Sequence, residues 1–167
     1  LHACRRNVDM TYVVMDNRVY GMTKGQPSPT TEPDWDSKLS PEGTGLREFL
    51  PLTIALASGA NFIARGYTGD PNGLADLLVE AVRHPGFSFV EVLSPCITFR
   101  PEQLEWKKLV RAGGFKPTSE FARAVRRLLR DDGFDLGVLY RGARPAYQPR
   151  KAPTPRSIED LAARFAL

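Results

Sequence analysis

The chain has 167 residues, a formal net charge of +4 at pH 7 and a hydrophobic content of 42%, which suits one domain with a buried core. Its two cysteines, Cys4 and Cys96, are widely spaced, which argues against a disulfide scaffold and fits a reducing cytoplasm. No apolar run approaches the roughly 20 residues of a membrane-spanning helix, so no membrane partner is expected.

The charge is unevenly distributed along the chain. Residues 115–167 hold eleven Lys and Arg against six Asp and Glu, whereas residues 1–114 hold twelve against thirteen. A basic carboxyl-terminal region can bind nucleic acid or an acidic protein, although a solvated helix face and a loose tail explain it equally simply. The sequence has no RRM, zinc-finger or KH signature, so nucleic acid is not expected as a partner.

The first part of the chain alternates between predicted helices and strands. Residues 1–6 are typical of the end of a helix, and the apolar run at 11–16 predicts a buried strand. A long loop rich in proline and glycine follows at 17–45, and loops of this length are usually functional. A short helix is expected at 50–58, with Pro51 tolerated in its first turn.

Two further strands enclose a longer helix. The first of them is predicted at 61–65, and Asp70 then has the features of a helix N-cap, because a proline follows at the first helical position. Arg65 and Asp70 flank a loop, where they could pair, cap a helix or contact a neighbouring subunit. The helix ends near 84–86, and a strand rich in Phe and Val is predicted at 87–93. This order predicts an α/β fold with a parallel sheet and right-handed crossovers.

The pattern is less regular after the third strand. Residues 101–110 are expected to be helical, with Trp106 covering the core. Thr118 is a candidate N-cap for a helix that ends at Gly133, and an edge strand is predicted at 136–140.

The carboxyl-terminal residues predict a linker and a last helix. Four prolines and the lack of an apolar period at 144–155 are typical of a linker. Ser157, with Asp160 three residues later, predicts a capped final helix at 158–166.

The most informative segment is 16–26, with the sequence Asp-Asn-Arg-Val-Tyr-Gly-Met-Thr-Lys-Gly-Gln. It follows a strand, and open α/β sheets bind cofactors beyond the carboxyl ends of their strands. The side chain of Asn17 can offer an oxygen to a hard cation, and Thr23 and Lys24 suit phosphate or carboxylate oxygens. The same residues also fit an ordinary turn and a solvent-facing lysine.

A second motif, Leu-Ser-Pro-Cys-Ile-Thr-Phe at 93–99, follows the third predicted strand. This motif and three others resemble the β subunits of 2-oxoacid:ferredoxin oxidoreductases, in which similar motifs occur in the same order along the chain. The other three are at 16–26, 69–71 and 137–141. The resemblance extends from residue 1 to about residue 145. It implies a mostly parallel α/β sheet flanked by helices, which is a partial thiamine-diphosphate-binding fold with a helical carboxyl-terminal extension.

The resemblance implies roles for the loop after the first strand. Asn17 would supply its side-chain oxygen, and Val19 its backbone carbonyl, to a Mg²⁺ ion that bridges to the diphosphate of the cofactor. Lys24 would hold the carboxylate of the 2-oxoacid substrate. The residues that would line the cofactor beside the metal are Tyr20, Gly21, Met22 and Thr23.

The two cysteines have different expected roles. A lone cysteine is most often a small buried hydrophobic residue, but the resemblance implies that Cys96 is the fourth thiolate ligand of a [4Fe–4S] cluster. Cys4 is given no role in the cluster. The sequence contains no Gly-Asp-Gly element and no cysteine cluster, so we expect it to be a carboxyl-terminal portion of a longer subunit. The expected parts are a partial thiamine-diphosphate-binding domain at 1–114, a helix and edge strand at 115–143, and a linker with a terminal helix at 144–167.

The implied activity is oxidative decarboxylation of a 2-oxoacid, most closely 2-oxoglutarate, to an acyl-CoA, with electrons passing through the [4Fe–4S] cluster to ferredoxin. The expected partners are the α subunit of the same oxidoreductase, ferredoxin, the 2-oxoacid and coenzyme A. Two alternatives stay open. A non-redox thiamine-diphosphate decarboxylase subunit would not need Cys96, and a catalytically incomplete subunit-interaction module would use the basic tail for docking.

Overall fold

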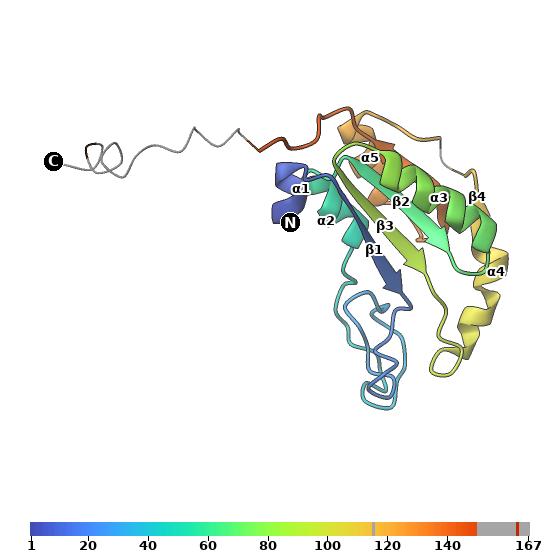
Figure 1. Cartoon of the computed structure of the whole chain (residues 1–167). Helices are drawn as coiled ribbons and strands as arrows, with labels where there is room; N and C mark the ends of the chain where they lie inside the picture. The colour runs from blue at the N-terminus through green and yellow to red at the C-terminus, as the bar shows by residue number, and fades with distance from the viewer. Residues whose placement is uncertain (115, 150–162, 164–167) are drawn as a thin grey trace.

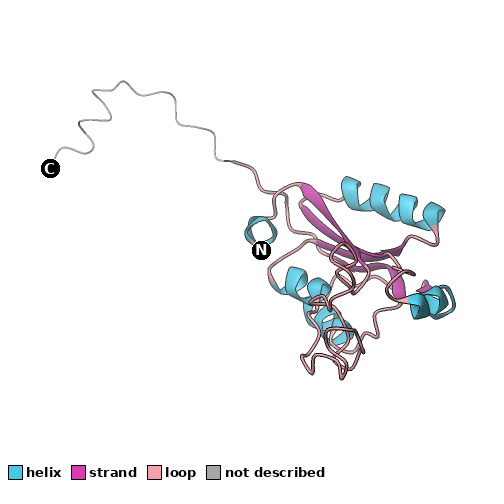
Figure 2. Cartoon of the chain, turned by 90° about the horizontal axis from the view of Figure 1, so that it is seen from below, coloured by secondary structure: helices cyan, strands magenta, loops and turns pink. Residues whose placement is uncertain are grey.

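The computed structural model describes residues 1–114, 116–149 and 163. Its centre is a five-stranded sheet in the order β1-β3-β2-β5-β4, with helices on both faces (Figures 1 and 2). The strands are β1 (Met10–Asp16), β2 (Phe62–Tyr67), β3 (Phe87–Leu93), β4 (Arg111–Ala112) and β5 (Asp135–Arg141). The helices are α1 (His2–Arg6), α2 (Pro51–Ala57), α3 (Pro71–Arg83), the 3₁₀ helix η1 (Pro101–Glu105), α4 (Trp106–Leu109) and α5 (Phe121–Leu128).

The sheet is mostly parallel, as predicted. Strands β1, β3 and β2 run in the same direction, β5 is antiparallel to β2, and β4 is parallel to β5. Asp16 at the end of β1 and Tyr67 at the end of β2 both pair with Leu93 of β3. The carboxyl ends of the three parallel strands therefore meet at one edge of the sheet.

Every residue of β3 is buried, because β3 has a neighbouring strand on each side and helices on both faces. On one face, α3 packs Leu77 and Ala81 against Val90 and Val92. The helices α2 and α5 lie on the opposite face (Figure 2), where Leu52, Leu56 and Leu128 are buried in the core. Burial of each large aliphatic side chain contributes about 1.5–3 kcal/mol, so the core holds the carboxyl edge of the sheet in place.

Three roles were left open for Arg65 and Asp70, and the structure shows the partners of both residues within this chain. Asp70 caps α3, since its carboxylate accepts a hydrogen bond from the backbone N–H of Gly73 at 3.1 Å. Arg65 instead turns into the protein and pairs with Glu91 and Asp131. The predicted N-cap at Asp70 is confirmed.

The predicted N-cap at Thr118 is wrong. Thr118 pairs with Tyr140 in an isolated β-bridge, so its backbone is committed to the sheet. Its hydroxyl accepts a hydrogen bond from the N–H of Glu120 at 3.1 Å, and Glu120 is the residue that precedes α5. The helix therefore begins two residues later than a capping threonine would place it.

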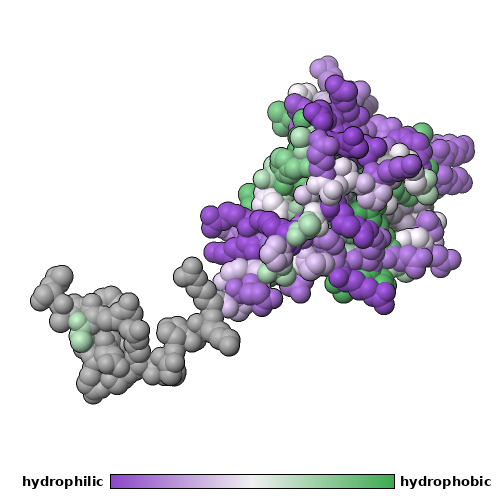
Figure 3. Space-filling view, turned by 90° about the horizontal axis from the view of Figure 1, so that it is seen from above, coloured by the Kyte–Doolittle hydropathy of each residue, from purple (hydrophilic) through white to green (hydrophobic). Residues whose placement is uncertain are grey.

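The burial predicted for the first strand is also wrong in the described residues. The strand β1 forms, but it pairs only with β3 and lies at the edge of the sheet. Tyr12 is 51% and Met15 60% exposed. A parallel strand is buried only when both of its faces are covered. Apolar residues accordingly reach the surface of the described part among polar ones, as the green patches in Figure 3 illustrate.

Near the carboxyl terminus, two predictions change. The strand β5 is not outermost, because β4 pairs with its first two residues. The predicted linker begins with an anchored segment, since the guanidinium of Arg144 donates hydrogen bonds to the carbonyls of Cys4 and Gly59 at 2.9 and 2.6 Å. The predicted final helix at 158–166 lies outside the described residues, apart from residue 163. The division of the chain into parts at 1–114, 115–143 and 144–167 stays a prediction. Among the described residues, no helix has the length and apolar character to cross a bilayer.

Candidate functional site

Two loops leave the carboxyl edge of the parallel strands, one after β1 and one after β3 (Figure 1). The backbone N–H of Ser94 donates to the carbonyl of Asp16 at 2.8 Å and so extends the pairing of the strands. The sulfur of Cys96 lies 3.4 Å from the position that a Cβ atom would occupy on Gly21. The two motifs singled out in the sequence are therefore in contact.

Asn17 begins the first loop with a tight turn. Its side-chain oxygen accepts a hydrogen bond from the backbone N–H of Val19 at 3.1 Å, and Arg18 between them adopts a left-handed conformation with φ of 53°. An amide oxygen has two lone pairs, so this bond leaves the Asn17 oxygen able to bind a hard cation. The turn thus holds the side-chain oxygen of Asn17 against the backbone N–H of Val19.

The rest of the first loop folds back on itself. The N–H of Tyr20 donates to the carbonyl of Gln26 at 2.9 Å, and the N–H of Gly25 donates to the carbonyl of Tyr20 at 3.0 Å. A Cβ atom on Gly25 would lie 2.7 Å from the ring of Phe99, and φ there is +90°. Gly25 is therefore required both by the turn and by the close approach of the second loop.

The tip of this loop faces solvent in the described residues. Met22 is fully exposed, and Thr23 and Lys24 are also exposed. Met22 consequently does not pack into the core of the described residues. The tip offers an ammonium group, a hydroxyl and a flexible thioether to a bound molecule or to a neighbouring subunit.

The two cysteines lie in different environments. Cys4 is buried in the core cluster, and burial raises the pKa of its thiol, so it is a packing residue. Cys96 is partly exposed and forms no disulfide, so its sulfur is free to act as a thiolate ligand. These positions fit the different roles expected for the two residues.

Gln103 joins the two loops, and the sequence analysis did not single it out. Its side-chain nitrogen donates to the backbone carbonyl of Asn17 at 2.8 Å, and its side-chain oxygen accepts the backbone N–H of Cys96 at 2.7 Å. The side chain is completely buried. One feature of the sequence could have identified it. Gln103 lies three positions before Trp106 in a short predicted helical segment, which places the two residues on the same, inward-facing side.

A network of charged side chains makes a second connection between the loops. The carboxylate of Glu32 bridges Arg18 and Arg100, with both N–O distances at 2.7 Å. Arg100 also donates to the backbone carbonyl of Arg18 at 3.3 Å. Burial tends to raise the pKa of Glu32, but the hydrogen bonds from the two arginines outweigh it and hold that pKa below its ordinary value. Sequence reasoning also missed this network.

A second buried ionic cluster lies beneath the carboxyl edge. Arg65 contacts Glu91 and Asp131, each at 2.6 Å, and all three side chains are almost inaccessible to solvent. Burial disfavours the charge of Arg65, but the two carboxylates outweigh this effect and raise its pKa. The cluster adjoins a polar cavity of about 230 Å³ that also touches Arg18 and Glu32.

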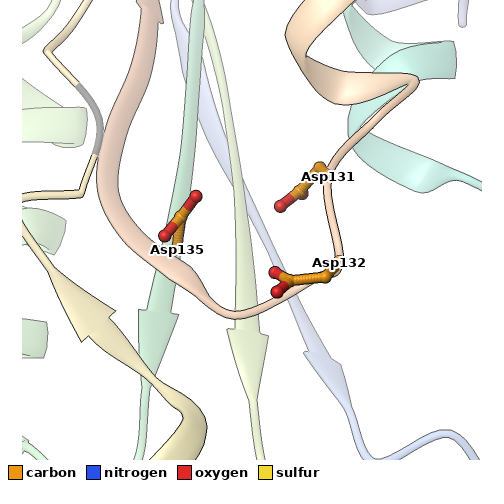
Figure 4. Close-up of side chains that lie close together, drawn as sticks. All are labelled: Asp131, Asp132 and Asp135. Atoms are coloured by element: carbon orange, nitrogen blue, oxygen red, sulfur yellow. The ribbon is translucent and has the colours of Figure 1, made fainter.

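Asp131, Asp132 and Asp135 form an acidic group in which the oxygens lie within 4.8 Å of one another (Figure 4). Asp131 pairs with Arg65, while Asp132 and Asp135 each pair with Arg111 at 2.6 Å. These ion pairs offset the negative charges, and the hydrogen bond from Arg111 lowers the pKa of Asp132. The arrangement is therefore explained by arginine binding.

A largely apolar groove of about 820 Å³ opens beside the first loop, between β1, α1 and α2. It reaches Asn17 and Tyr20 at one end and Cys4 at the other. Volumes of this size hold cofactors and other small molecules. The first loop therefore combines exposed polar groups with an adjoining apolar surface.

Comparison with known proteins agrees with the two motifs. Residues 1–92 match the family described as thiamine pyrophosphate enzyme, C-terminal TPP binding domain. The 2-oxoglutarate synthase subunit KorB of Archaeoglobus fulgidus is 45% identical over 98 residues, which cover 59% of this chain and 37% of that protein. A 2-oxoacid:ferredoxin oxidoreductase subunit beta of Sulfolobus sp is 33% identical over 174 residues, which cover 94% of this chain and 57% of that protein.

A solved structure gives the same result for the fold. The 2-oxoglutarate:ferredoxin oxidoreductase from Magnetococcus marinus, with 2-oxoglutarate, coenzyme A and succinyl-CoA bound, superposes with a TM-score of 0.85 at 30% identity. The match covers 99% of this chain and 61% of that chain. The chain thus spans less than two thirds of each of these relatives. The predicted resemblance and the predicted fold class are confirmed, whereas the residue roles stay predictions.

Proposed function

Because the chain belongs to the family of thiamine pyrophosphate enzyme C-terminal TPP-binding domains, we propose that it is a portion of the β subunit of a 2-oxoacid:ferredoxin oxidoreductase. The proposed reaction converts a 2-oxoacid and coenzyme A to an acyl-CoA, CO₂, a proton and two electrons. The observation that carries the proposal is the contact between the Gly21 loop and Cys96 at one edge of the sheet. A subunit that decarboxylates without electron transfer has no need of a thiol there.

The preference for 2-oxoglutarate rests on the relatives. KorB subunits are named for 2-oxoglutarate, and the Magnetococcus marinus structure contains 2-oxoglutarate. In the proposed site, Lys24 binds the carboxylate of the 2-oxoacid as a point charge. Its exposure on the loop tip leaves the ammonium group available for that contact.

We assign the metal and the organic cofactor to the first loop. Asn17 would offer its side-chain oxygen, and Val19 its backbone carbonyl, to Mg²⁺, which prefers oxygen ligands and accompanies substrate phosphates. Thiamine diphosphate, when bound, supplies the nucleophile and the electron sink for decarboxylation. The residues of this chain that would line it are Tyr20, Gly21, Met22 and Thr23.

We assign the iron–sulfur cluster to the second loop. Cys96 would contribute one thiolate to a [4Fe–4S] cluster, which accepts electrons one at a time. The backbone N–H of Cys96 is already bonded to Gln103, which orients the residue independently of any metal. The other three ligands would come from outside this chain.

The proposed protein partners are the α subunit of the same oxidoreductase and ferredoxin. Arg123 and Arg126 on α5 support an acidic electron carrier, since both are mostly exposed and share a single carboxylate, that of Glu120, at 3.6 and 3.7 Å. Complementary charge accelerates association with such partners. We place the complex in the cytoplasm, because unpaired cysteines and the proposed cluster both suit a reducing compartment.

The test is an anoxic assay of the complete complex with 2-oxoglutarate, pyruvate and 2-oxobutyrate, following reduction of a viologen dye. We expect dye reduction that requires coenzyme A and is fastest with 2-oxoglutarate, in a preparation that contains iron, sulfide and Mg²⁺. Release of CO₂ without dye reduction, from a preparation that contains Mg²⁺ but no iron, would instead identify a non-redox decarboxylase. The absence of both activities would favour a subunit-interaction module.

A further inference from the structure

The side chain of Gln103 occupies a special position between the two loops. One planar amide bonds the carbonyl of Asn17 and the N–H of Cys96, with N–O distances of 2.8 and 2.7 Å. Asn17 is 86 residues away in sequence and Cys96 is seven residues away. A single rigid group therefore spans the interval between the residue proposed to bind Mg²⁺ and the residue proposed to bind the cluster.

The 3₁₀ helix η1 explains how Gln103 reaches this position. The N–H of Gln103 donates to the carbonyl of Arg100 at 3.0 Å, which closes a turn of three residues. Side chains three residues apart lie on the same face of a 3₁₀ helix. Accordingly, Arg100 bonds the carbonyl of Arg18 while Gln103 bonds the carbonyl of Asn17, the preceding residue.

The surroundings leave the Gln103 amide little freedom. Its side chain is 0% exposed, and the neighbouring Trp106 is buried against Phe134 with ring centroids 5.8 Å apart. A buried amide with both ends bonded cannot rotate without leaving polar groups unpaired, which is energetically costly. Gln103 therefore fixes the separation of the two loops as well as joining them.

We propose that Gln103 is a positioning residue that holds the Asn17 turn and the Cys96 backbone at a fixed separation, and so sets the path for electrons from the thiamine cofactor to the iron–sulfur cluster. This inference rests on the proposed function. Each turnover breaks the bond between the carboxylate and the 2-oxo carbon, forms the thioester and releases two electrons. A [4Fe–4S] cluster held in part by Cys96 would accept such electrons one at a time, so their transfer would depend on the separation that Gln103 maintains.

Two substitutions distinguish the contributions of the two hydrogen bonds made by Gln103. Gln103→Met has a similar length and volume and removes both bonds without opening a large cavity. Gln103→Glu keeps an oxygen for the N–H of Cys96 but loses the donor to the carbonyl of Asn17. The matched control is Gln148→Met, because Gln148 is exposed in the described carboxyl-terminal segment.

The experiment uses the complete anoxic complex. Iron, sulfide and bound thiamine diphosphate are measured first, and the paramagnetic resonance spectrum of the reduced cluster is recorded. In a single turnover with 2-oxoglutarate and coenzyme A, chemical quenching then measures CO₂, and the loss of visible absorption measures reduction of the cluster. Decarboxylation and electron transfer are thereby followed separately.

For Gln103→Met we expect normal cofactor content, CO₂ release within about twofold of the wild type, cluster reduction slowed by about 10–100-fold, and an altered resonance spectrum. For Gln103→Glu we expect slowed reduction with a spectrum close to that of the wild type, because the bond to Cys96 is retained. The Gln148→Met control should match the wild type in every measurement.

Two results would overturn the positioning role of Gln103 and leave the proposed function intact. One is wild-type cluster reduction in both Gln103 variants. The other is parallel loss of cofactors, CO₂ release and cluster reduction, which would mean that Gln103 serves folding only. If the wild-type complex itself holds no iron and reduces no dye, the proposed function fails and the positioning role fails with it.

Discussion

Replacement of Glu32 by alanine tests whether charged side chains hold the candidate site together. Glu32 neutralises Arg18 from the first loop and Arg100 from the second, both at 2.7 Å. In Glu32→Ala, Arg100 still pairs with Glu102 at 2.8 Å. Among the described residues, the guanidinium of Arg18 keeps its contacts with the rings of Trp106 and Phe134 but loses its carboxylate partner.

The magnitude follows from burial. Removing one partner of a fully buried ion pair costs about 3–5 kcal/mol. The side chains of Arg18 and Arg100 are 13% and 6% exposed, but that of Glu32 is 30% exposed. Together with the retained pair to Glu102, this exposure reduces the expected loss to about 2 kcal/mol. At about 2 kcal/mol per molar urea, the unfolding midpoint falls by about 1 M.

The two tryptophans of the chain report on this network directly. The guanidinium of Arg100 lies 4.5 Å from the ring centre of Trp35, and that of Arg18 lies 5.3 Å from the ring centre of Trp106. Urea unfolding followed by tryptophan fluorescence therefore monitors both ends of the bridge. The matched control is Glu42→Ala, an exposed glutamate in the same long loop. Equal midpoints for the Glu32 variant and the wild type would refute the assigned contribution of the network.

Three further predictions concern the loops and the core. Gly25→Ala should weaken binding of thiamine diphosphate to the complete complex more than Gly45→Ala does, as measured by calorimetry. Both positions have a positive φ, but of the two only Gly25 lies against a neighbouring ring. Equal effects of the two substitutions would contradict this prediction. Cys96→Ser should lower the iron content of the complex and leave thiamine diphosphate bound. Asn17→Ala should weaken the binding of thiamine diphosphate and leave the iron content unchanged. Loss of both groups in either variant would count against separate sites. Burial lowers the pKa of His84, so its stabilising contribution is present above about pH 6.5 and is lost as the pH falls below that value. The urea midpoint should therefore depend less on pH in His84→Gln than in the wild type between pH 5 and 8. An unchanged pH dependence would refute the assignment.

The parts of the fold that the sequence predicted well depend on local or uniform signals. The strand β3 was predicted with its observed bounds, Phe87–Leu93, because it is buried on all sides and its sequence is therefore continuously apolar. Asp70 was identified as an N-cap because its hydrogen bond reaches only to residue 73. In both cases the neighbouring residues contain the information that decides the structure.

The failures arose where distant residues decide the outcome. Thr118 has the composition of a helix cap, but pairing with Tyr140 claims its backbone first. The burial of β1 depends on a neighbouring strand and not on its own apolar sequence. Neither outcome is encoded within a few residues of the segment concerned, so pattern analysis could not supply it.

The candidate site divides in the same way. Asn17 and Cys96 were identified because each lies in a motif directly after a predicted strand, and parallel strands end at a common edge. The residues that join the two loops were missed, since Glu32 and Gln103 find their partners across 68 and 86 positions of sequence. A glutamine or glutamate in a loop has no local feature that distinguishes such a role from ordinary exposure to solvent.

The polar character of these connections has a physical reason. At the carboxyl edge, the chain leaves the sheet, and the carbonyls of Asn17 and Arg18 lose the partners that a continuing strand would provide. Buried backbone groups need hydrogen bonds, which apolar packing cannot supply. The side chains of Arg100 and Gln103, together with the hydroxyl of Thr31 on the carbonyl of Arg18, meet this need, and their bonds are directional. The same bonds that prevent a desolvation penalty therefore define the relative position of the two loops. An insertion between Cys96 and Gln103 should consequently disturb the site more than one at the exposed tip near Met22.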